Sequence, residues 1–184
     1  MNELSLHILD IVQNSLKANA KLIEITINEN SKDDSYTIII SDNGHGMDEK
    51  TLTKVSDPFY TTRTTRKVGM GTSLFKMAAE LCDGTFHIQS TVGVGTKVTA
   101  SFVKSHVNRA PLGAIEDTIT ILMLNDCDVD VVYKHIIDKK EYIFDTREVR
   151  QVLDGIPFTD YDVIAWVKNN IKDGINTITE EEHK

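Results

Sequence analysis

The sequence predicts an α+β protein in which helices cover one face of a mixed β-sheet. Three observations support this fold class. The chain opens with apolar residues at helical spacing, two β-branched runs follow at once, and the order of a helix and then two strands recurs farther on. Elements in this order bury apolar helix faces against one side of a sheet, which gives a two-layer α/β sandwich.

The first helix and the first two strands are expected before residue 42. Over about residues 3–18, apolar and small residues recur on one helix face, at Leu4, Ile8, Ile11, Val12, Ser15 and Leu16. In residues 22–28 isoleucines alternate with polar residues, and residues 35–41 contain a continuous β-branched run. Both patterns are typical of strands.

A long polar stretch separates these elements from the next helix. Residues 48–70 show no lasting period and are expected to form a loop with at most a short helix. A helix is expected over 72–82, with its sheet-facing side formed by Leu74, Met77, Ala78 and Leu81. Residues 85–90 and 96–103 are then expected to be strands around the glycine-containing turn "TVGVG".

The chain is long enough for one domain and a small second unit. We predict the first domain at 1–104 and an irregular linker at 104–113, where Pro and Gly interrupt polar residues. A small α+β unit is predicted at 112–178, followed by a disordered tail at 179–184. Within that unit the patterns predict strands at 117–124, 129–136 and 141–144, then helices at 146–153 and 161–171.

Composition argues against two classes of partner. The formal net charge of -8 and the pI near 5.2 disfavour general attraction to nucleic acid or to an anionic membrane. No stretch approaches the roughly 20 apolar residues of a membrane span. The first residues carry acids where a secretory signal carries basic residues. We therefore expect a cytoplasmic protein without a nucleic-acid or membrane partner.

The stretch "SDNGHGM" is the first candidate for chemistry. Asp42 ends a buried strand, where a carboxylate needs hydrogen-bond partners, and the exocyclic amine of a base could supply one. Gly44 and Gly46 would let a flat ligand lie against the backbone. The same letters also describe an ordinary Asx turn, and this stretch alone leaves both interpretations open.

A second candidate lies on the first helix. Asp10, Asn14 and Lys17 are spaced to share one face, roughly opposite the apolar side. A carboxylate can accept a proton, an amide oxygen can bind Mg²⁺, and an ammonium group can contact a phosphate. The alternative is an ordinary solvated helix face.

The third candidate is "KVGMGTS", where Gly69 and Gly71 precede a helix expected to start near Thr72. Backbone N–H groups at such a helix start can hold an anion. An ordinary helix-capping turn has the same letters. Arg63, just before it in the polar stretch, could reach a polyphosphate or could be solvated.

The order and spacing of these motifs resemble the GHKL ATPases, the superfamily of gyrase, the large heat-shock chaperone, histidine kinases and MutL. The resemblance covers residues 3–103 and rests on five sequence boxes in the right order. They are "LHILDIVQNSLKANAKLIEI", "DNGHGM", "DPFYTTR", "VGMGTSLFKMAAEL" and "TVGVGTKVTASF". The resemblance implies the Bergerat type of sandwich, with ATP and Mg²⁺ bound beneath a lid.

The resemblance also implies roles for individual residues. Asp42 would read adenine, with Thr96 supporting it, and Asn14 would ligate Mg²⁺. Lys17 would contact a phosphate. The remaining nucleotide-binding positions implied by the boxes are Gly44, Gly46, Met47, Thr62, Arg63, Gly69, Met70, Gly71 and Thr72. Thr62 and Arg63 belong to the hinge of the lid.

Departures from the family pattern bear on activity. At the position four residues before Asn14, MutL-like ATPases and anti-sigma-factor kinases carry a Glu base, histidine kinases usually carry Asn, and this chain has Asp10. Asp10 could still orient a water or hydroxyl. We find no clear counterpart of the catalytic Lys of gyrase and MutL. Because the sequence begins at the first box, we do not expect a complete orthodox sensor kinase, which needs a helical hairpin with a phosphoacceptor His ahead of that box.

Two functions follow from the resemblance. In the first, the protein hydrolyses ATP or passes its γ-phosphoryl group to a regulatory protein partner in signalling. In the second, ATP drives a non-catalytic conformational switch that acts through residues 112–178. A third alternative is a protein that has lost nucleotide binding. The sequence does not indicate the phosphoacceptor or the oligomeric state.

Overall fold

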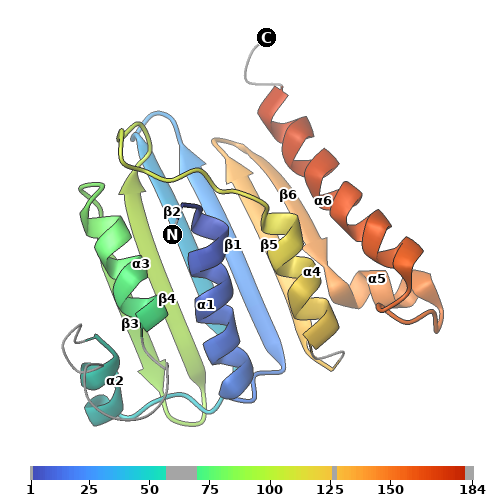
Figure 1. The fold of residues 1–184 in the computed structure, drawn as a ribbon, viewed down its shortest axis with the longest axis horizontal. Coiled ribbons are helices and arrows are strands. Elements are labelled where there is room, and N and C mark those ends of the chain that lie inside the picture. Colours follow the sequence, from blue (N-terminus) through green and yellow to red (C-terminus); the bar gives the residue numbers. More distant parts are fainter. Residues whose placement is uncertain (1, 57–69, 126–127, 181–184) are drawn as a thin grey trace.

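The computed structural model describes residues 2–56, 70–125 and 128–180. These residues form a six-stranded mixed sheet in the order β3-β4-β2-β1-β5-β6. Helices α3, α1 and α4 lie side by side on one face of the sheet (Figure 1). The predicted α+β class with a mixed sheet is therefore confirmed.

The helices and strands follow one another along the chain in a simple order. The part before residue 104 contains α1 (Leu4–Lys17), β1 (Leu22–Asn30), β2 (Ser35–Asp42), α2 (Glu49–Ser56), α3 (Met70–Glu80), β3 (Phe86–Thr91) and β4 (Gly95–Val103). The later part contains α4 (Ile115–Asn125), β5 (Asp130–Ile137), β6 (Lys140–Asp145), α5 (Thr146–Leu153) and α6 (Tyr161–Glu180).

Helix α1 packs its predicted apolar face on the sheet. Leu4, Ile8, Ile11, Val12 and Ser15 are all buried. Its first turn has no side-chain cap from Glu3. Instead, the N–H groups of its first two residues donate to the carbonyl oxygens of Pro111 at 2.9 Å and Leu112 at 2.8 Å. The segment before α4 thus satisfies amides that a helix start would otherwise leave unpaired.

Helix α3 turns a different face to the sheet from the one predicted. It begins at Met70, and its buried residues are Thr72, Phe75 and Ala79. The prediction that Leu74, Met77 and Leu81 pack on the sheet is wrong, since they are 37%, 59% and 63% exposed. Both sides of the helix are apolar, and the large Phe75 ring decides between them by packing against Phe86 and Phe102.

Residues 117–124 form part of helix α4, so the strand predicted there is wrong. β-branched residues favour strands only weakly, and burial at helical spacing overrides that preference here. Ile115, Ile119 and Leu122 are at most 1% exposed. The buried Thr118 and Thr120 hydroxyls donate to the carbonyl oxygens of Ser5 and Glu116. These bonds remove the cost of burying them.

The strands after α4 extend the same sheet. β5 pairs in parallel with β1, with Ile25 opposite Tyr133, and β6 pairs antiparallel with β5. Residues 1–104 and 112–178 therefore contribute strands to one sheet. The division into a domain at 1–104 and a small unit at 112–178 stays a prediction.

Helix α6 packs on α4 and β6 and reaches Glu180. It therefore continues two residues into the predicted tail, whose residues 181–184 lie outside the described part. Within 2–56, 70–125 and 128–180, no helix combines the length and the apolar character needed to cross a membrane.

Candidate functional site

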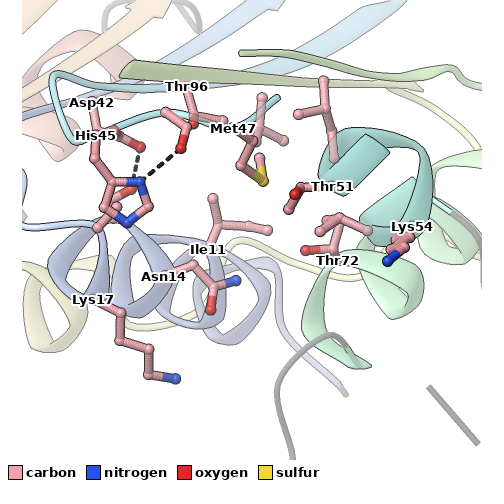
Figure 2. Close-up of a pocket in the computed structure, with 16 residues that line it drawn as sticks. Ile11, Asn14, Lys17, Asp42, His45, Met47, Thr51, Lys54, Thr72 and Thr96 are labelled. Atoms are coloured by element: carbon pink, nitrogen blue, oxygen red, sulfur yellow. Dashed lines mark hydrogen bonds between the residues drawn. The ribbon is translucent and has the colours of Figure 1, made fainter. Parts of the chain in front are cut away.

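A cavity of about 410 Å³ opens between α1, the loop after β2, and helices α2 and α3. This volume lies within the range of small-ligand sites. Figure 2 shows side chains from all of these elements around the hollow. Of the residues predicted from the sequence, seven lie on its wall: Asn14, Lys17, Asp42, Gly46, Met47, Thr72 and Thr96.

The Asp42 carboxylate is held in place by two hydrogen bonds. Ser15 on α1 donates its hydroxyl to Oδ2 at 2.7 Å, and the Gly44 N–H donates to Oδ1 at 2.9 Å. Asp42 is the last residue of β2, where the strand reaches the end of α1. These two donors fix the direction of the carboxylate. Each oxygen keeps a further lone pair for a ligand.

The loop after Asp42 requires its two glycines. Gly46 has a φ of 68°, and an added Cβ would lie 2.0 Å from the Thr91 carbonyl oxygen. At Gly44 an added Cβ would lie 2.8 Å from Ala18. His45, between them, donates its N–H to the Ala18 carbonyl oxygen at 2.9 Å. The loop is therefore pressed between α1 and the β3–β4 turn, where only glycine fits.

Thr96 lies next to Asp42 because β4 pairs with β2 in that register. Its hydroxyl is 2.9 Å from the Ser90 hydroxyl, which also accepts the Met47 N–H at 2.8 Å. Ser90 donates to the Gly95 carbonyl oxygen at 3.0 Å. This network joins the loop after β2 to the two strands beneath it.

Of the three polar residues predicted on helix α1, two line the cavity and one does not. Asn14 is half-buried and Lys17 is exposed, and both line the cavity. Asp10 is not among the lining residues. It contacts the start of α3, since an added Cβ on Gly71 would lie 2.8 Å from Asp10 Oδ2. Asp10 therefore lies beside the first amides of α3, one turn of α1 away from Asn14.

The start of α3 supplies one wall residue. Thr72 lines the cavity and is 4% exposed, whereas Met70 is 59% exposed. At Gly71 α3 lies close against α1, since an added Cβ would be 2.6 Å from the Asp10 Cβ. The predicted site residues Thr62, Arg63 and Gly69 lie outside the described residues.

Several wall residues were missed by sequence reasoning. Ser15 was counted with the apolar face of the first helix, although a Ser on such a face is a signal for a buried hydrogen bond. The apolar walls come from Ile11, Ile88 and Val98. Helix α2 contributes Thr51, Lys54 and Val55, and its short polar sequence gave no signal for this.

His7 is the titratable group most perturbed near the site. It is 3% exposed and stacked on Phe75, with ring centroids 5.2 Å apart. Burial lowers its pKa to about 4. Its Nδ1 is buried without a hydrogen-bond partner. His7 is therefore a neutral packing residue between α1 and α3 at neutral pH.

Comparison with known proteins identifies the family of this region. A family model described as histidine kinase-, DNA gyrase B-, and HSP90-like ATPase matches residues 2–106. Sensor histidine kinase YvrG of Bacillus subtilis is 31% identical over 99 residues, which cover 52% of this chain and 17% of that protein. Sensor protein kinase FleS of Pseudomonas aeruginosa is 33% identical over 110 residues, covering 60% and 27%. The chain thus spans less than a third of the length of these relatives.

A solved structure shares the fold. It is described as the N terminal domain of a DNA repair protein and superposes with a TM-score of 0.53 at 17% identity. The superposition covers 78% of this chain and 52% of that chain. Since residues 2–106 are a smaller share of the chain than this, the likeness in fold extends into the later elements.

Proposed function

The chain belongs to the histidine kinase-, DNA gyrase B- and HSP90-like ATPases, and we propose from this premise that its cavity binds Mg²⁺-ATP for phosphoryl transfer or hydrolysis. One observation carries the proposal. Asn14 from α1, Asp42 from β2 and Thr96 from β4 are far apart in the sequence but line one cavity of suitable volume. All three lie within the residues that the family model matches.

Adenine would bind at the Asp42 end of the cavity. The carboxylate is already oriented by Ser15 and Gly44 and can accept a hydrogen bond from an exocyclic amine. The neighbouring Thr96 hydroxyl offers a second polar contact. Apolar side chains such as Ile11 and Met47 would lie against the faces of the base.

The phosphates would extend toward Asn14, Lys17 and the first turn of α3. The described residues contain no group of three His, Cys, Asp or Glu side chains that could hold a metal. Mg²⁺ in nucleotide sites is commonly held by one or two protein oxygens together with phosphates and water. The Asn14 amide oxygen on the cavity wall fits that arrangement. A bound Mg²⁺ would neutralise charge on the phosphates.

Asp10 would orient the attacking water or hydroxyl. Its carboxylate lies against Gly71, beside the amides at the start of α3. Phosphoryl transfer depends mainly on positioning and charge neutralisation. The Asp10 carboxylate beside the phosphates would therefore be the only general base that the reaction needs. The phosphoryl acceptor would be water or a regulatory protein, as the sensor kinases among the relatives suggest. The cytoplasmic location stays a prediction.

The binding proposal is tested by Asp42→Asn. The Asn side chain can keep both contacts of Asp42, with Ser15 and with Gly44, while the charged acceptor is lost. We expect ATP affinity to fall by roughly 10-fold or more, the effect of losing a hydrogen bond to a charged group. Asp173→Asn on the exposed outer side of α6 is the matched control. Unchanged affinity in a folded Asp42→Asn variant would remove Asp42 from the site.

A nucleotide-dependent switch without turnover is the second candidate. It is favoured by one observation, namely that Asp10 is not among the cavity-lining residues. Steady-state ATP turnover of the parent chain and of Asp10→Asn separates the two functions. We expect the variant to lose at least 10-fold in turnover while still binding ATP. Equal rates near zero with retained binding would support the switch.

A further inference from the structure

Helix α2 contributes a charged side chain to the cavity, and the five sequence boxes assign it no role. Thr51, Lys54 and Val55 line the cavity and stand three and four residues apart, so they share one side of the helix. Lys50, one turn before Lys54, is exposed and is not among the lining residues. The side of α2 that carries Lys54 therefore faces a ligand in the cavity.

The charges on the wall lie at different ends of the cavity. Among the described residues on the wall, the ionisable side chains are Lys17, Asp42, His45 and Lys54. Figure 2 shows Asp42 at one end of the hollow and Lys54 at the other, with Asn14 between them. A ligand with hydrogen-bond donors at one end and negative charge at the other fits this arrangement. The two ends of the cavity thus fix the orientation of such a ligand.

Lys54 lies at the end of the cavity toward which the phosphates would extend. The proposed function directs the phosphates from Asp42 past Asn14 to the first turn of α3, where Thr72 lies on the wall. Helix α2 packs against α3, so Lys54 lies at the same end of the cavity as Thr72. The phosphate farthest from adenine would come nearest to Lys54. A lysine ammonium has three donors on a flexible stem and can contact phosphate oxygens at such a site.

We propose that Lys54 contacts the terminal phosphate of the bound nucleotide and makes the cavity prefer a nucleoside triphosphate to a diphosphate. The inference rests on the proposed function and adds a specificity-determining residue to it. Lys17 on α1 and Lys54 on α2 then hold the phosphates from two walls of the cavity. The chain carries a net charge of -8, which repels a triphosphate, and the two cations on the wall offset that repulsion locally.

The alternative is that the stem of Lys54 only covers the apolar wall, as lysine stems often do. Lys54→Met separates the two interpretations, because it keeps an unbranched apolar stem and removes the charge. Lys54→Arg keeps a cation at the same position. Lys50→Met is the matched control, since it removes the same charge from the same helix at a residue that does not line the cavity.

The experiment measures the affinities of the whole chain and the three variants for Mg²⁺-ATP, Mg²⁺-ADP and adenosine by calorimetric titration. We expect Lys54→Met to lower ATP affinity by about 3–10-fold, between the effect of an exposed ion pair and that of a hydrogen bond to a charged group. Its affinities for ADP and adenosine should change by less than about 2-fold, because neither carries the third phosphate. Lys54→Arg and Lys50→Met should keep the preference of the parent chain for ATP over ADP.

Three outcomes would overturn the proposal. One is a Lys54→Met variant that binds ATP as tightly as the parent chain. Another is an equal loss of affinity for ATP, ADP and adenosine, which would show that the stem only packs on the wall. The third is a Lys50→Met variant that loses as much ATP affinity as Lys54→Met. If the folded parent chain bound none of the three ligands, the proposed function itself would be wrong, and this inference with it. Thermal melting of each variant confirms folding.

Discussion

The family-matched residues 2–106 and the later elements α4 to α6 use their polar side chains in opposite ways. In the first region, Asn14, Asp42 and Thr96 line a cavity. In the second, polar side chains pair with one another or with the first region. Buried His135 lies 2.8 Å from the Tyr133 hydroxyl and 2.9 Å from Glu29 on β1.

The difference indicates a division of roles within one sheet. Polar groups that face a cavity are available to a ligand, whereas polar groups that satisfy each other in the interior stabilise the fold. Burial alone would raise the pKa of Glu29, but hydrogen bonds from His135 and Lys104 lower it overall. The later elements thus hold the edge of β1 in place, and the earlier ones form the candidate site.

The largest effect on stability is expected where β5 of the later elements pairs with β1. Tyr133 is 0% exposed, so Tyr133→Ala should lower the free energy of unfolding by roughly 3–5 kcal/mol, as large aromatic truncations do. Tyr133→Phe keeps the ring and removes only the bond to His135, at a cost of about 1 kcal/mol. Urea denaturation measures both. A small loss for Tyr133→Ala would show that the later elements do not support the sheet.

The next largest effect is expected at Gly46 of the site, compared with Gly93 in the β3–β4 turn. Gly46 and Gly93 have similar φ values of 68° and 75°, but an added Cβ meets Thr91 at Gly46 and open space at Gly93. Gly93→Ala should therefore cost only about 1 kcal/mol of backbone strain. Gly46→Ala should cost more, roughly 2–4 kcal/mol, and weaken ATP binding. The measurements are thermal melting and nucleotide titration. If Gly46→Ala and Gly93→Ala lowered the melting temperature and the ATP affinity equally, the steric explanation would be contradicted.

A smaller effect depends on pH. His7 has a pKa of about 4 in the folded protein, below its ordinary 6.5. As pH falls from 6.5 to 4, the unfolded chain takes up a proton that the folded chain excludes, so stability decreases across that window. In His7→Phe this part of the pH dependence should disappear. Melting temperatures at pH 7, 5.5 and 4.5 test this, with His87→Phe at an exposed site as the control.

The smallest effect is expected at a surface ion pair of the later elements. Lys168 lies 2.8 Å from Asp117, with both side chains well exposed. Lys168→Met should change the free energy of unfolding by less than about 0.5 kcal/mol, as exposed pairs usually do. Urea denaturation in low and high salt measures it. A loss above 1 kcal/mol would mean that surface charges, and not buried contacts, join α6 to α4.

Local patterns were sufficient for much of the fold. The alternation in β1 and the apolar face of α1 each have one side that can be buried, so their sequences predict them directly. Helices α3 and α4 were harder because apolar residues occur around much of their surfaces. Which side becomes buried depends on partners distant in sequence, such as Phe102 for α3 and Ser5 for α4.

Parts of the candidate site also depend on contacts between residues distant in sequence, so local patterns could not predict them. The motif residues Asp42 and Thr96 are neighbours because of strand register, whereas before the structure only the family resemblance implied that they act together. The Ser15 contact and the α2 wall could not be predicted, because they depend on how a helix end meets a loop. The parallel pairing of β5 with β1 also has no local signal, because the sequence of neither strand specifies which strand it pairs with.

The hydrogen bonds from Leu4 and Ser5 to Pro111 and Leu112 fix the N-terminal end of α1 to the segment before α4. Asn14 and the Ser15 that holds Asp42 lie toward its other end. A displacement of Pro111 and Leu112 would therefore be transmitted along α1 to the candidate site. A substitution in that segment would in this way change the position of Asp42, although the segment does not line the cavity.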